Sequence, residues 1–107
     1  MSDTILVYTT FTEKEEALTL CRILLEKHLI SCAQIDSPVD SLYWWNGKIE
    51  QEKEHRLLMK STQSLWEELQ LEITRNHSYD VPEILAVPVS GISKEYEKWM
   101  QGVLKNE

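Results

Sequence analysis

The chain has 107 residues, of which 42% are hydrophobic and 27% charged, the size and composition of one globular domain. Eighteen acidic against 11 basic residues give a net charge of −7, which disfavours binding to nucleic acid or to an anionic membrane. The sequence contains no apolar run near the roughly 20 residues of a membrane span and no secretory signal pattern. Two cysteines are too few for a disulfide framework, and without an export signal we expect both thiols to be reduced in the cytoplasm. We expect residues 1–107 to form a single domain.

The first elements are a strand and a helix. Residues 5–8 form a continuous apolar, partly β-branched run, which is typical of a strand buried on both faces. Thr12 precedes Glu15 by three residues, as in a capping box, and apolar residues then recur at helical spacing. We therefore expect an amphipathic helix over residues 13–29.

The next strand region contains a proline. Residues 31–35 and 39–45 both have strand character, and Pro38 lies between them. Because proline lacks the N–H that a sheet hydrogen bond needs, we expect a break or a bulge at this position.

Asn46-Gly47 predicts a tight hairpin turn. Both central residues of a type I′ turn need positive φ, which Asn and Gly adopt readily. A two-residue turn places Trp44 opposite Ile49, and the returning strand then covers residues 48–61. Its segment 50–55 is too polar for a core, so we expect this hairpin to project beyond the body of the domain.

The remaining elements are a helix, a strand and a last helix. Ser64 begins a second capping-box pattern with helical spacing to about residue 76, residues 84–89 read as a strand, and Ser93 can cap the final helix. The order β-α-β-β-α-β followed by α predicts a ferredoxin-like α+β fold with an antiparallel four-stranded sheet and two helices on one face. We expect the third helix and neighbouring subunits to cover the other face.

Three glutamates form a row in the polar part of the hairpin. Glu50, Glu52 and Glu54 share one face of a strand because side chains alternate with period two. Such a row attracts a counter-cation or a basic partner strand. Alternatively, it is a solvated edge that resists aggregation.

His77 is the candidate metal ligand. It follows a predicted helix and shares a loop with Tyr79, Asp80 and Glu83. An imidazole beside carboxylates suits a borderline cation such as Cu(II) or Zn(II). The alternative is a histidine that ends a helix and hydrogen-bonds the carbonyls of its last turn.

Three aromatic residues precede the hairpin turn. Tyr43, Trp44 and Trp45 present large apolar surface on a segment with little core of its own. We expect them to form an interface between subunits rather than a surface that stacks on a ligand.

Several blocks of this sequence together resemble the CutA family of divalent-cation tolerance proteins. The blocks are residues 41–50, 58–60 and 77–84, with Cys32, Tyr96 and Trp99 at further matching positions. The resemblance covers essentially the whole chain. It implies a ferredoxin-like subunit in a cytoplasmic homotrimer whose long hairpins pair with neighbouring subunits, a link to copper tolerance, and no catalytic activity.

The resemblance also implies an inter-subunit cleft. Its matching residues are Cys32, Trp44, Lys60, His77, Tyr79 and Glu83. Within this set, His77 is the predicted ligand of Cu(II) or another divalent cation, none of them obligatory. Some family members credited with copper binding have Cys at the position of Thr9 and His at that of Asn76.

The resulting prediction is a non-enzymatic, trimeric protein of divalent-cation tolerance that binds metal ions weakly in this cleft. The alternative is a signalling-type module that binds a small effector or a protein partner in the same cleft. Neither interpretation includes nucleic acid or a membrane as a partner.

Overall fold

A computed structural model describes residues 3–105, so the first two and last two residues of the predicted domain 1–107 lie outside the described residues. The elements, in chain order, are β1 (Thr4–Phe11), α1 (Lys14–Glu26), β2 (Cys32–Ile35), β3 (Val39–Trp45), β4 (Lys48–Thr62), a 3₁₀ turn (Gln63–Leu65), α2 (Trp66–Arg75), β5 (Leu85–Pro88) and α3 (Lys94–Val103). The predicted order of strands and helices is confirmed.

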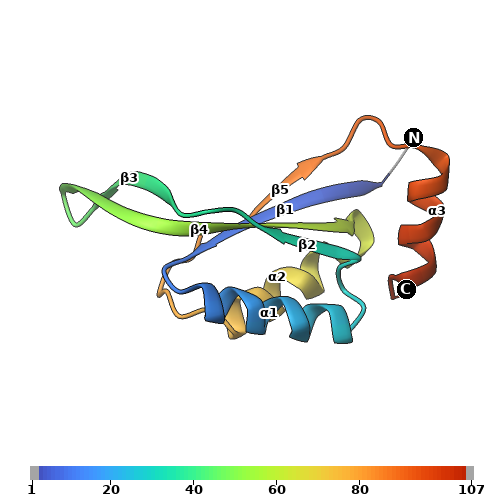
Figure 1. Ribbon diagram of the computed structural model, residues 1–107, viewed down its shortest axis with the longest axis horizontal. Helices are drawn as coiled ribbons and strands as arrows, with labels where there is room; N and C mark the ends of the chain where they lie inside the picture. Colours follow the sequence, from blue (N-terminus) through green and yellow to red (C-terminus); the bar gives the residue numbers. More distant parts are fainter. Residues whose placement is uncertain (1–2, 106–107) are drawn as a thin grey trace.

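The sheet is antiparallel throughout, with the strand order β2-β4-β1-β5. Strand β3 pairs with the outer part of β4, so β2 and β3 are one strand interrupted around Pro38. Figure 1 shows α1 and α2 on one face of the sheet and α3 standing at the end where β4 finishes. This is the predicted ferredoxin-like arrangement.

The hairpin of β3 and β4 has the predicted turn and register. Asn46 has φ of 51° and Gly47 of 77°, and Trp44 pairs with Ile49. The hairpin projects beyond the sheet and helices (Figure 1), which gives the molecule dimensions of 44 × 26 × 24 Å. Its 15-residue strand β4 therefore belongs partly to the body and partly to this extension.

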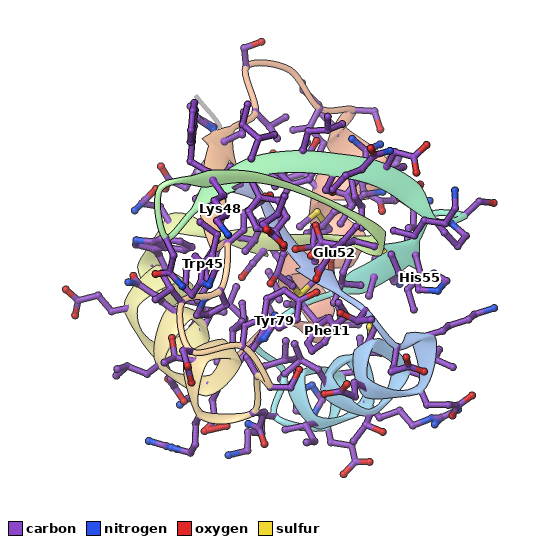
Figure 2. The ribbon with its side chains drawn as sticks, turned by 90° about the vertical axis from the view of Figure 1, so that its left-hand side faces the viewer. Phe11, Trp45, Lys48, Glu52, His55 and Tyr79 are labelled. Carbon is purple, nitrogen blue, oxygen red and sulfur yellow. The ribbon has the colours of Figure 1, made fainter. Side chains whose placement is uncertain are left out.

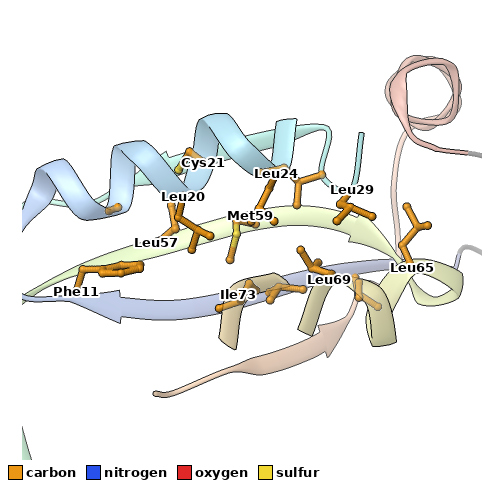
Figure 3. Packing of buried hydrophobic residues seen from close by; sticks show 14 residues of the cluster. Phe11, Leu20, Cys21, Leu24, Leu29, Leu57, Met59, Leu65, Leu69 and Ile73 are labelled. Atoms are coloured by element: carbon orange, nitrogen blue, oxygen red, sulfur yellow. The ribbon is translucent and has the colours of Figure 1, made fainter. Parts of the chain in front are cut away.

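The hydrophobic core fills the space between the sheet and the two helices α1 and α2 (Figure 3). Leu57 and Met59 of β4 point into it because alternate strand residues share one face. They meet apolar stripes of the helices, which include Leu20, Leu24, Leu69 and Ile73.

Two predicted helix caps are absent. Neither α1 nor α2 has a side-chain hydrogen bond at its N-cap, so the capping boxes predicted at Thr12 and Ser64 are wrong. The Thr12 hydroxyl instead lies 2.8 Å from the Tyr79 hydroxyl. The cap predicted at Ser93 is confirmed, since its hydroxyl accepts from the Tyr96 N–H.

The sheet face opposite α1 and α2 is only partly covered. The third helix was expected to lie over it, but α3 stands at one end (Figure 1). Leu85 and Val87 of β5 pair on this face with Tyr8 and Leu6, and they remain 55% and 44% exposed. This face therefore keeps apolar surface accessible to another chain.

Candidate functional site

An open groove of about 890 Å³ lies between the hairpin and the loop that follows α2. Figure 2 views this end of the molecule, with Trp45 and Glu52 of the hairpin and Tyr79 of the loop labelled. We call it the acidic groove, and its lining includes five carboxylates, those of Glu50, Glu52, Glu54, Asp80 and Glu83.

The hairpin register determines which side chains face this groove. Tyr43 pairs with Glu50, and Trp45 with Lys48, so these aromatic rings share a strand face with the glutamate row. Trp44 also borders the groove, but its side chain lies on the opposite face of β3 because neighbouring strand residues alternate. The groove thus combines aromatic and anionic side chains.

One hydrogen-bond network closes the inner end of the groove. The Tyr79 hydroxyl donates to Glu54 Oε2 at 2.7 Å and lies 2.8 Å from the Thr12 hydroxyl. Glu54 is only 6% exposed, so this bond supplies its buried carboxylate with a donor. Burial raises the pKa of the Tyr79 phenol, and the bond to Glu54 raises it further, so the phenol stays protonated.

The outer part of the groove is more exposed and strongly anionic. Partial burial, a hydrogen bond to Glu52 and the charges of the nearby glutamates raise the pKa of the Tyr43 phenol. Glu50 and Glu52 are exposed, so their carboxylates can meet a solvated cation. Their shared negative potential favours positively charged ligands.

His77 is held by hydrogen bonds on both ring nitrogens. Its Nε2 lies 2.9 Å from the carbonyl oxygen of Thr10, and Nδ1 accepts from the Tyr79 N–H at 3.1 Å. This pattern requires a neutral imidazole that donates from Nε2. The ring stacks on Phe11 with centroids 4.1 Å apart, and burial lowers its pKa.

This geometry goes against the predicted role of His77 as a metal ligand. Coordination needs a nitrogen lone pair, and the Nδ1 lone pair already accepts from the backbone of Tyr79. His77 therefore attaches the loop after α2 to β1. Its Nε2 lies 3.1 Å from the hydroxyl of Thr9, the position where some family members have Cys.

Apart from His77, the predicted cleft residues fall into two groups within one chain. Trp44, Tyr79 and Glu83 border the acidic groove. Cys32 and Lys60 pair with each other across β2 and β4, and Lys60 lies six residues from Glu54 along β4, about 20 Å at the rise of a strand. A single cleft containing all five residues would need a second copy of the chain.

Sequence reasoning missed two contacts that shape these groups. One is the bond between Tyr79 and Glu54, and the other is the bond from Lys60 Nζ to the Tyr96 hydroxyl at 3.1 Å. Both join residues at least 25 positions apart, so no local pattern carried them. Within residues 3–105, no cluster of three or more His, Cys, Asp or Glu side chains is arranged to hold a metal ion.

The fold and the groove define a ferredoxin-like subunit with an acidic, cation-attracting surface beside a projecting hairpin. Residues 5–103 match the family of CutA1 divalent ion tolerance proteins, and the chain belongs to this family. The family is described by cation tolerance and not by a catalysed reaction. None of the described helices has the length and apolar character to cross a membrane.

The similarity to individual family members extends over nearly the full chain. The divalent-cation tolerance protein CutA of Pyrococcus horikoshii is 42% identical over 90% of this chain and 93% of its own. A crystal structure of a CutA1 variant from that organism has a TM-score of 0.92 at 40% identity and covers 95% of this chain and 99% of its own. CutA1 from Oryza sativa has a TM-score of 0.93 at 33% identity, over 97% and 95%.

The predicted cytoplasmic location is corrected by these relatives. A CutA structure from Archaeoglobus fulgidus, 33% identical with a TM-score of 0.92 over 95% of this chain and 99% of its own, is named a periplasmic protein. The Arabidopsis thaliana relative, 35% identical over 95% of this chain and 56% of its own, is named chloroplastic. Membership of this family therefore does not imply the cytoplasm.

Proposed function

We propose that this chain forms a homotrimer that binds divalent cations weakly, Cu(II) among them, where the acidic groove meets a neighbouring subunit, and so contributes to copper tolerance. The observation that carries this proposal is the row of Glu50, Glu52 and Glu54 along one wall of an open groove. The family's description as divalent ion tolerance proteins supports it.

The spacing of the glutamates explains why binding is weak. Alternate residues of a strand lie about 7 Å apart, whereas a cation needs its oxygen ligands at about 2.0–2.6 Å. One ion therefore cannot be held by all three carboxylates at once, and Glu54 is already bonded to Tyr79. Glu50 and Glu52 attract the ion, and a neighbouring chain completes its coordination.

The choice of metal follows the general order of affinities. Sites built from nitrogen and oxygen ligands bind Cu(II) more tightly than the other common divalent first-row metals. An exposed carboxylate groove without a free imidazole adds little selectivity of its own. We therefore expect Cu(II) to bind first among several cations that the groove accepts.

The trimer is supported by apolar surface on the hairpin. Leu42, Trp44 and Ile49 share the face opposite the glutamate row and are 65%, 72% and 63% exposed. Exposed apolar patches of this kind mark protein interfaces. Tyr43 and Trp45 lie on the groove side. A neighbouring subunit that packs against both faces of the hairpin would therefore cover Tyr43, Trp44 and Trp45, the three residues of the predicted interface.

The test is a calorimetric titration of metal-free, reduced protein with Cu(II). We expect the double variant Glu50→Gln with Glu52→Gln to bind Cu(II) at least tenfold more weakly than the natural chain. The matched control, Glu67→Gln with Glu68→Gln on α2, removes the same charge elsewhere and is expected to change the affinity less than twofold.

A second comparison separates the groove from the histidine. We expect His77→Gln to retain Cu(II) binding because the one lone pair of the neutral imidazole already accepts from the Tyr79 N–H. Loss of binding in His77→Gln alone would place the metal on the imidazole and contradict the proposal. An equal loss of Cu(II) affinity in both double glutamate variants would mean that only the overall charge of the chain matters. This result would also contradict the proposal.

A further inference from the structure

The ammonium group of Lys60 has a tyrosine hydroxyl as its hydrogen-bond partner. Its Nζ donates to the Tyr96 hydroxyl at 3.1 Å and lies 5.1 Å from the centre of that ring. None of the ion pairs between described residues includes Lys60. In a chain with 18 acidic and 11 basic residues, the half-buried Lys60 therefore has a phenol but no carboxylate as its partner among residues 3–105.

The ammonium of Lys60 keeps its charge in these surroundings. Burial disfavours the charged form, but the hydrogen bond to the Tyr96 hydroxyl outweighs this effect. The bond to Tyr96 raises the pKa of Lys60, so the side chain is charged at neutral pH. Such a site gains from binding an anion.

The residues around Lys60 provide the other contacts of a ligand site. Tyr96 and Trp99 of α3 have ring centroids 5.4 Å apart, and Trp99 is 46% exposed. Because the Tyr96 oxygen accepts from Lys60, its own O–H can donate to an anion beside the ammonium. Figure 1 shows α3 beside the end of β4, the strand in which Lys60 lies two residues before the last.

We propose that Lys60, Tyr96 and Trp99 form a binding site for a small organic oxyanion, a carboxylate or phosphate that carries a flat apolar group. The ammonium and the phenol bind the oxyanion, and the indole packs against the flat group. The alternative function predicted from the sequence is a signalling-type module that binds a small effector. This site assigns that effector to the class of organic oxyanions. It does not depend on cation binding in the acidic groove.

The site is tested by calorimetry on the full chain with benzoate and inorganic phosphate as probes, with ionic strength held constant by chloride. We expect saturable binding of benzoate that weakens at least tenfold in Lys60→Met, which keeps the apolar stem and removes the charge. Lys48→Met at the hairpin turn is the matched loss of one charge and is expected to change the affinity less than twofold. Trp99→Ala should weaken benzoate at least threefold and leave phosphate unchanged.

Alkylation of Cys32 provides an independent measurement, because this residue pairs directly with Lys60 across the strands. We expect bound benzoate to slow the reaction of Cys32 with iodoacetamide at least threefold. Cys21 serves as an internal reference, since burial raises the pKa of its thiol to about 11 and keeps it unreactive.

Three results would overturn this proposal. The first is the absence of saturable binding for both probes. The second is an equal weakening of benzoate binding in Lys60→Met and in Lys48→Met. The third is that neither probe binds, while Lys60→Met and Glu83→Gln both dissociate the assembly. The last result would mean that a carboxylate of a neighbouring copy is the missing counter-charge. Each of these results leaves the Cu(II) titration of the acidic groove to be judged separately.

Discussion

The two halves of β4 lie in opposite surroundings. In the inner half, residues 56–62, Leu57, Met59 and Ser61 are fully buried, and the Ser61 hydroxyl donates to the Leu29 carbonyl at 2.6 Å. In the outer half, residues 48–53 are all exposed. One continuous strand thus passes from a region stabilised by the chain's own core to a region whose apolar side chains are exposed.

The charges on the two halves differ as well. The outer half carries Glu50 and Glu52 of the acidic groove, and the inner half carries Lys60, whose ammonium donates to the Tyr96 hydroxyl. About 20 Å separates Lys60 from Glu54 at the rise of a strand. The two halves of β4 thus place opposite charges in different surroundings.

The largest effect is expected from the aromatic residues at the hairpin end. Trp44→Ala with Trp45→Ala should abolish assembly, because both exposed rings lose the apolar area that a neighbour would bury. Light scattering measures the mass, and far-UV circular dichroism checks that the fold persists. Leu71→Ala, which removes an exposed side chain on α2, should leave the mass unchanged. An unaltered mass in the tryptophan variant would contradict the trimer proposal.

A pair of truncations compares the two halves of β4 directly. In the Trp44→Ala, Trp45→Ala background, Leu57→Ala should lower the free energy of unfolding by about 2–5 kcal/mol, since it leaves a cavity in the core. Ile49→Ala in the same background should change it by less than about 0.5 kcal/mol, because the side chain is 63% exposed. Chemical denaturation measures both values. Equal losses would show that the outer half is also part of the core.

The smallest effect concerns the pH dependence of stability. Burial lowers the pKa of His77 in the folded chain, whereas an unfolded histidine titrates near 6.5. The contribution of neutral His77 is complete above about pH 6.5 and is lost as the pH falls through this value towards the lowered folded pKa, because the unfolded state takes up the proton first. The denaturation midpoint should therefore be lower at pH 5.5 than at pH 7.5.

The control for this pH effect is another imidazole. His77→Gln should reduce the difference between the two midpoints, and His55→Gln on β4, a position outside this network, should preserve it. If all three proteins show the same pH dependence, His77 does not attach the loop in the way that its hydrogen bonds indicate.

Much of the fold was predictable because it follows from local periodicity. The spacing of apolar residues predicts the order of strands and helices, and Asn46-Gly47 predicts the turn because few residues tolerate positive φ. That turn sets the register of the hairpin, and the register places Glu50, Glu52 and Glu54 together on one face. This much of the candidate site was therefore accessible without a structure.

The remaining part of the site depends on contacts between distant segments. Thr12 has the spacing of a helix cap, but its hydroxyl meets Tyr79, which lies 67 positions away in the sequence. The residues near His77 in the sequence are typical of a metal site, but β1 supplies the partner for its Nε2. A hydrogen bond needs its two atoms within about 3 Å, and only the packing of the sheet brings these groups so close.

The sequence by itself determined the family, the order of the elements, the turn and the row of glutamates, because each depends on residues near one another in the chain. Only the tertiary structure decided that His77 holds a loop, that Glu54 is bonded to Tyr79, and that Lys60 donates to Tyr96. The physical reason is that periodicity assigns a side chain to a face, while its partner depends on which distant segments pack against that face.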